Sequence, residues 1–160
     1  MILYHGSTEV IRKPEILENT RMLDFGKGFY TMTDRQQAAL WAQKASARRQ
    51  IDTKLISIYE FDLATAEKEL NILRFNRPDA AWMDFVSTCR RGKHPDNNYD
   101  IVWGPAATDK AYVAFQLYEI GILRKREMLK YIKKELFPNQ ILFHTERSLE
   151  FCFFKESIFL

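Results

Sequence analysis

Residues 24–30, with the sequence DFGKGFY, restrict the possible folds of this chain more than any other stretch. The two glycines predict a tight turn at the edge of a strand, because glycine adopts backbone angles that other residues avoid. Asp34 then offers an N-cap for a helix running to about Arg49, which places Trp41 eleven residues after Tyr30. Two aromatic side chains held in this way can form the two walls of a slot for a flat ring.

The remaining hydrophobic pattern predicts a mixed α+β fold. A length of 160 residues fits one domain, which we expect to span residues 1–160. Strands are expected at residues 1–5, 54–62, 70–75, 99–103 and 139–144, and helices at 34–49, 79–90, 109–120 and 124–136. From Thr145 onward we expect a short helix or turn and then another strand. Strands and helices do not alternate strictly, which favours α+β over a doubly wound parallel sheet.

Composition narrows the class of protein. The net charge of +3 is too small to predict nucleic-acid binding, and the basic cluster at residues 124–134 is interpreted as the solvated face of a helix. Cys89 and Cys152 lie among apolar residues, far apart in the sequence, and are expected to be buried thiols. No apolar run approaches the roughly 20 residues of a membrane span, and no secretory signal is seen. We therefore expect a cytoplasmic protein without membrane contact.

Several common catalytic motifs are absent. The chain has no phosphate-binding loop, and Gly26 and Gly28 lack the third glycine of a dinucleotide-binding fingerprint. Its histidines, His5, His94 and His144, show no helical spacing for a metal, so no metal site is predicted.

Three short motifs remain, and they occur in a fixed order. They are YHGS at residues 4–7, DFGKGFY at 24–30 and QILFHT at 140–145; the strand at 99–105 (YDIVWGP) accompanies them. This order resembles the ADP-ribosyltransferase-like superfamily of the diphtheria-toxin and poly(ADP-ribose) polymerase type, with its His–Tyr–Glu signature. The match is best with a bacterial group of uncharacterised domains (DUF3990-like), and it covers nearly the whole chain. The implied fold is a split β-sandwich of two small antiparallel sheets with surrounding helices, and an NAD cleft between the sheets.

The resemblance assigns roles to individual residues. His5 is expected to bond a hydroxyl of the adenosine-side ribose, and Gly6 to pair its main chain with the nicotinamide carboxamide. Ser7 adds a polar contact to that group. Tyr30 and Trp41 are expected to sandwich the nicotinamide ring. The implied catalytic residues are His5, Tyr30 and the residue at the third signature position.

That third position departs from the family pattern, because it holds Gln140 where the signature has glutamate. Glutamine accepts a hydrogen bond but carries no charge, and losing one electrostatic partner typically costs ~3–4 kcal/mol of transition-state stabilisation. Glu146 and Glu150 do not align with the strand start and are interpreted as solvated helix charges. The chemistry itself resembles glycoside hydrolysis, since cleaving the nicotinamide–ribose bond passes through an oxocarbenium-like state.

The expected function is NAD-dependent mono-ADP-ribosyl transfer to an unidentified protein or nucleic-acid acceptor, with NAD as substrate. A role as a bacterial toxin or defence component would add an antitoxin partner. Two alternatives stay open: an NAD glycohydrolase, and a non-catalytic module that binds NAD or ADP-ribose. Each residue alone also has a simpler interpretation, namely a strand-end histidine at His5, core aromatics at Tyr30 and Trp41, and a main-chain contact at Gln140.

Overall fold

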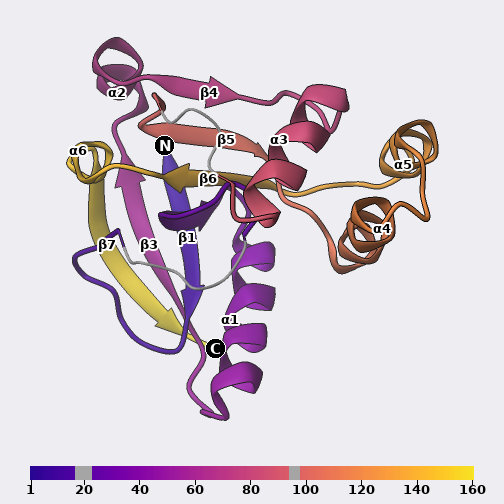
Figure 1. Cartoon of the computed structure of the whole chain (residues 1–160). Helices are drawn as coiled ribbons and strands as arrows, with labels where there is room; N and C mark the ends of the chain where they lie inside the picture. Colours follow the sequence, from indigo (N-terminus) through magenta and orange to yellow (C-terminus); the bar gives the residue numbers. More distant parts are fainter. Residues whose placement is uncertain (17–22, 94–97) are drawn as a thin grey trace.

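The computed structural model describes residues 1–16, 23–93 and 98–160, in which seven strands and six helices are formed (Figure 1). His94 lies outside the described residues. The strands are β1 (Ile2–Ser7), β2 (Phe29–Met32), β3 (Leu55–Phe61), β4 (Ile72–Arg74), β5 (Ile101–Pro105), β6 (Asn139–Phe143) and β7 (Cys152–Phe159). The helices are α1 (Arg35–Arg49), α2 (Leu63–Glu69), α3 (Ala80–Arg90), α4 (Asp109–Glu119), α5 (Lys125–Ile132) and α6 (Glu146–Leu149).

The strands form one sheet in the order β4–β5–β6–β2–β1–β3–β7, antiparallel except for the parallel pair β4–β5. The α+β class is therefore confirmed. The expectation of two separate sheets is wrong for the described residues, because β1 and β2 connect the two halves through the register pair Tyr4 and Met32. Figure 1 shows that β4, β5 and β6 nevertheless lie across the direction of β1, β3 and β7.

The bend of the sheet encloses a hydrophobic core that both halves share. Leu3 and Phe61 reach this core from β1 and β3, while Ile101, Ile141 and Phe143 reach it from β5 and β6, and all five are buried. Burying side chains of this size removes apolar surface from water at about 25 cal/mol per Å². The two halves of the sheet therefore share one hydrophobic core.

The opposite face of the sheet is covered by helices. Ala38 of α1 packs with Met32 and Ile56, while Trp82 of α3 packs in a second cluster with Leu142. Alternate residues of each strand therefore face different cores, as the two-residue period of a strand requires.

Helix starts follow the capping rules. The carboxylate of Asp34 accepts a hydrogen bond from the N–H of Gln37 at 2.8 Å, and Asp79 caps α3 in the same way. The starts of α1 and α3 therefore agree with those predicted from the sequence. Helix α2 is not predicted from the sequence, because its seven residues are too few to show a clear helical period.

Helices α4 and α5 form a hairpin that projects from the body of the molecule in Figure 1. Gly121, with a φ of 80°, lies in the turn between them. The basic side chains at residues 124–134 are exposed, as predicted for a solvated helix face. Among the described residues, no helix has the length and hydropathy that crossing a membrane requires.

Both cysteines are buried and free, as the sequence predicted. Burial raises the pKa of each thiol, Cys89 and Cys152, to about 12. A thiol of this kind is protonated at neutral pH and is a poor nucleophile.

Candidate functional site

The three sequence motifs lie on three neighbouring strands. Gln140 is on β6, Tyr30 is on β2, and His5 and Gly6 are on β1, and the sheet order places β2 between the other two. Residues more than a hundred positions apart in the sequence thereby lie on adjacent strands.

The pairing between β1 and β2 is short. It consists of the single register pair Tyr4 and Met32, whereas β1 and β3 are paired along six residues. Beyond that pair, the ring of His5 links the strands instead: its Nδ1–H donates to the main-chain oxygen of Tyr30 at 2.6 Å. The same ring stacks on Phe29 with 4.7 Å between centroids. The side chain of His5 thus joins β1 and β2 where main-chain pairing between the two strands is limited to one register pair.

Burial lowers the pKa of His5, and the charge of Arg49 lowers it further, although the bond to Tyr30 opposes both effects. The ring is therefore neutral in the fold near pH 7. In the unfolded chain it gains a proton below about pH 6.5.

We expect this difference to make stability depend on pH. The unfolded state binds more protons than the folded state below about pH 6.5, so the His5 contribution is lost as the pH falls through the lowered pKa of the folded protein. His5→Asn keeps an N–H donor for Tyr30 but does not titrate. Urea unfolding at pH 7.5 and 5.5 should therefore show a smaller pH dependence for the variant, and an equal dependence in both proteins would contradict this assignment.

The predicted site residues do not all share one face of the sheet. The register pairs put Gly6, Tyr30 and Gln140 on the face that the helices cover. His5 and Ser7 alternate with Gly6 along β1, so their side chains point to the other face, where His5 meets Phe29. The expectation of one cleft lined by all six side chains is therefore corrected for His5 and Ser7. Ser7 uses its hydroxyl to donate to the oxygen of Glu9 at 2.6 Å.

Gly6 lies directly under helix α1. A Cβ atom at this position would overlap the main-chain oxygen of Ala38 and would lie 2.7 Å from the nitrogen of Ala42. The sequence predicted a close approach to this glycine by a ligand, and the structure provides a close approach by a helix. The packing of α1 is a sufficient reason for glycine here.

Tyr30 closes the glycine turn that precedes it. Its hydroxyl donates to the oxygen of Gly26 at 2.7 Å and accepts from the N–H of Phe25 at 3.1 Å. Burial raises the pKa of Tyr30 well above its usual value, so this hydroxyl stays protonated. The ring is half-buried against the cluster that contains Leu142.

Trp41 lies on α1 and packs with a different cluster, which contains Met32. The ammonium of Lys44 lies 5.4 Å from the centroid of its ring. Tyr30 and Trp41 therefore pack against different clusters, and the expectation that they sandwich a nicotinamide ring stays a prediction.

Gln140 takes part in a buried polar cluster that the sequence did not reveal. Its side chain is 2% exposed, and its Nε2 donates to Oδ2 of Asp24 at 3.4 Å. The same Oδ2 accepts from the N–H of Ala107 at 2.7 Å, and Arg90 Nη1 lies 3.9 Å from Oδ1. The guanidinium of Arg90 also lies 4.0 Å over the ring of Tyr112. Asp24 thereby joins the glycine turn to several other parts of the fold.

The electrostatics of Asp24 reflect two opposing effects. Burial raises the pKa of its carboxyl, and the charge of Arg90 and the bonds from Ala107 and Gln140 offset part of that rise. Neither Asp24 nor Arg90 is among the site residues predicted from the sequence. The one available signal was a charged residue on the apolar side of α3, beside Val86 and Cys89.

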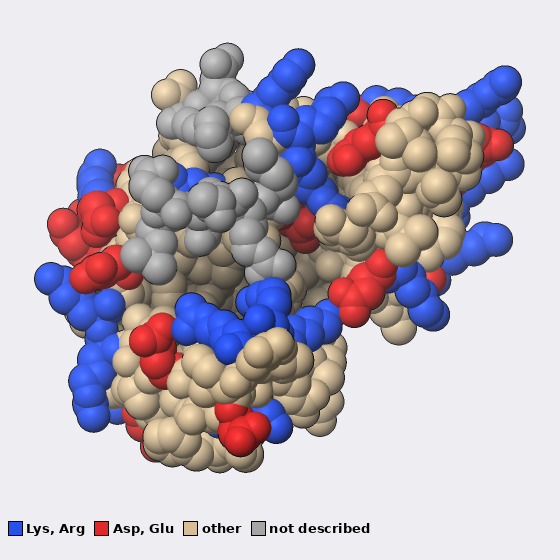
Figure 2. All heavy atoms as spheres, turned by 60° about the horizontal axis from the view of Figure 1, so that its bottom comes forward, with Lys and Arg blue, Asp and Glu red and all other residues tan. Residues whose placement is uncertain are grey.

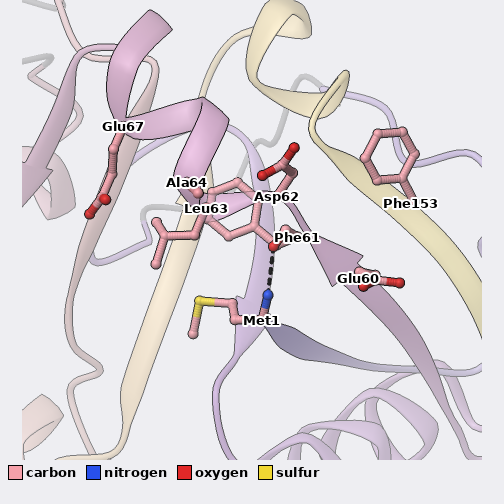
Figure 3. A pocket seen from close by; sticks show the side chains of 8 residues that line it. All are labelled: Met1, Glu60, Phe61, Asp62, Leu63, Ala64, Glu67 and Phe153. Atoms are coloured by element: carbon pink, nitrogen blue, oxygen red, sulfur yellow. Dashed lines mark hydrogen bonds between the residues drawn. The ribbon is translucent and has the colours of Figure 1, made fainter.

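A cavity of about 530 Å³ lies elsewhere, at the junction of β3 and α2 (Figure 3). Its lining is Met1, Glu60, Phe61, Asp62, Leu63, Ala64, Glu67 and Phe153. The amino group of Met1 donates to the oxygen of Phe61 at 2.6 Å beside it. None of the six predicted site residues lines this cavity, and its acidic side chains do not suit an anionic ligand such as NAD.

The chain belongs to the family described as "Protein of unknown function (DUF3990)", whose profile matches residues 1–154. No curated protein and no solved structure matches the chain.

Proposed function

We propose that this protein binds NAD beside β1, β2 and β6 and transfers its ADP-ribose to a macromolecular acceptor, as a member of the ADP-ribosyltransferase-like superfamily. In that reaction the bond between nicotinamide and C1′ of the ribose breaks, and nicotinamide leaves with the bonding electrons. A nucleophilic atom of the acceptor then forms a bond to C1′ and releases its proton.

One observation carries the proposal: three motifs that are distant in sequence lie on adjacent strands in the order β6–β2–β1. That order brings Gly6, Tyr30 and Gln140 to one face of the sheet, next to the helix that carries Trp41. At this place a single register pair between β1 and β2, Tyr4 and Met32, joins the two halves of the sheet, which cross each other in Figure 1. Figure 2 shows Lys and Arg side chains gathered along one margin of a hollowed face, a charge that suits a pyrophosphate.

A non-catalytic NAD or ADP-ribose binding module is the second candidate. It is favoured by Gln140, which is buried, neutral and bonded to Asp24, whereas the family signature has a glutamate. A neutral amide stabilises a developing oxocarbenium less than a carboxylate does.

Incubation with NAD labelled in its adenylate part separates these functions. Free nicotinamide together with labelled protein or nucleic acid supports the transferase, and free nicotinamide without labelled macromolecule supports an NAD glycohydrolase. Calorimetric binding without nicotinamide release supports the module. If NAD neither binds nor reacts, the proposal is wrong.

Tyr30→Ala is expected to weaken NAD binding roughly five- to tenfold, because it removes one stacking face worth about 1–1.5 kcal/mol. Tyr30→Phe is the matched control, since it keeps the ring and loses only the bonds to Phe25 and Gly26. Calorimetry should give a near-normal NAD affinity for Tyr30→Phe and a lowered melting temperature for both variants. Equal NAD affinities in Tyr30→Ala and the wild type would remove Tyr30 from the site.

A further inference from the structure

We propose that Asp24 supplies, through Gln140, the negative charge that the His–Tyr–Glu signature carries on its third residue. This inference rests on the proposed function and identifies Asp24 as a positioning residue of the same site. Gln140 touches the substrate in this scheme, and Asp24 acts on it from behind.

The contact between the two side chains fixes the orientation of the amide. An ionised carboxylate only accepts hydrogen bonds, so the NH₂ group of Gln140 must face Asp24, and the two atoms lie 3.4 Å apart. The bond uses only the nitrogen of Gln140, and in this scheme its carbonyl oxygen Oε1 accepts a hydrogen bond from a ribose hydroxyl. A donor bound to a charged acceptor also polarises the rest of its amide, which strengthens Oε1 as an acceptor.

The surroundings of Asp24 hold it in place for this task. The main-chain N–H of Ala107 donates to the oxygen that also faces Gln140, and Arg90 lies beside the other oxygen. The Arg90 side chain is only 6% exposed, and its Nη1 atom is buried without a hydrogen-bond partner among the described residues. The ion pair with Arg90 and the bond from Ala107 hold the carboxyl group of Asp24 beside Gln140, the residue at the third signature position.

The position of Asp24 in the chain supports the same conclusion. It opens the segment at residues 24–30, whose turn is closed by the hydroxyl of Tyr30. The negative charge of Asp24 also contributes to the raised pKa of Tyr30, so the two side chains are electrostatically coupled. Asp24 therefore contacts Gln140 directly and opens the turn that Tyr30 closes.

The test moves the carboxylate from one residue to the other. The variant Asp24→Asn removes the carboxylate, and Gln140→Glu places a second carboxylate beside it. The double variant Asp24→Asn/Gln140→Glu has a single carboxylate, which is now at position 140. We expect Asp24→Asn to lower kcat for nicotinamide release roughly a hundredfold, the range seen for loss of one electrostatic partner, while KM changes little. The double variant should regain wild-type kcat or exceed it. Asp79→Asn, which changes a carboxylate that caps α3, is the control and should leave kcat unchanged.

The outcomes separate two kinds of failure. A wild-type protein that neither binds NAD nor releases nicotinamide defeats the proposed function, and this inference with it. If the wild type binds NAD without cleaving it, the inference is overturned while NAD binding stands, because a charge that acts on the transition state then has nothing to stabilise. If Asp24→Asn loses only thermal stability, or the double variant does not recover, Asp24 is a structural brace and the inference alone is overturned.

Discussion

Gly6→Ala is expected to lower the free energy of unfolding by about 4 kcal/mol or more, enough to unfold many single domains. The added methyl group would overlap the main-chain oxygen of Ala38 and lie 2.7 Å from the main-chain nitrogen of Ala42. Because both atoms belong to the backbone of α1, no rotation of a side chain relieves the overlap. The helix would have to move away from β1, and Ala38 and Ala42 would lose their buried positions.

Urea or thermal unfolding measures this effect, with Gly121→Ala as the comparison. Gly121 has a φ of 80°, and a Cβ added there would have no neighbouring atom within 4 Å, so alanine meets strain without overlap. That strain is worth about 1–2 kcal/mol. If the two variants lose equal stability, the close packing of α1 on β1 is incorrect.

Arg90→Met should be the second most damaging substitution, with a loss of about 3 kcal/mol at pH 7. Removing one partner of a buried ion pair leaves the other charge uncompensated, and such losses are typically ~3–5 kcal/mol. We expect a stability loss at the low end of this range, because Nη1 of Arg90 and Oδ1 of Asp24 are 3.9 Å apart and the Asp24 side chain is 16% exposed. The contacts of the guanidinium with the rings of Tyr112 and Phe115 are lost as well.

The loss should depend on pH. Burial raises the pKa of Asp24, and the charge of Arg90 offsets part of that rise. The pKa of Asp24 is therefore expected to be higher in Arg90→Met than in the wild type. The folded protein then binds a proton that the unfolded chain releases above about pH 4, and stability falls as the pH rises toward the folded pKa. Denaturant melts at pH 4.5 and 7 should show the larger deficit at pH 7. Adding Asp24→Asn to Arg90→Met should recover part of the stability, and purely additive losses would show that the two residues are independent.

Features set by neighbouring residues were predictable from the sequence. Asp34 and Asp79 cap their helices through bonds that span two or three residues, so a short stretch of sequence contains the whole interaction. The strands β3 and β6 are predictable for a similar reason, since apolar and β-branched residues run through them. Helix α2 escapes prediction because the alternating pattern of the preceding strand extends through Asp62, which is the cap of the helix.

Features set by distant residues were not predictable. Asp24 and Gln140 are 116 positions apart, and nothing in either motif indicates that their side chains meet. A ligand was expected to approach Gly6 closely, and the sequence could not show that helix α1 packs against this residue. The single connected sheet also depends on one register pair, Tyr4 and Met32, which no local pattern specifies.

The order of strands in the sheet has a consequence for how the chain folds. β2 is paired with β6, and β3 is paired with β7, so strands from the first half of the chain are completed by strands from its last part. His144, beyond β6, also donates to the oxygen of Lys27 in the glycine turn, 117 positions away. Loops of this length must close before such contacts stabilise anything, which slows folding. During synthesis on a ribosome, β2 and β3 would therefore keep one edge unpaired until β6 and β7 had been synthesised.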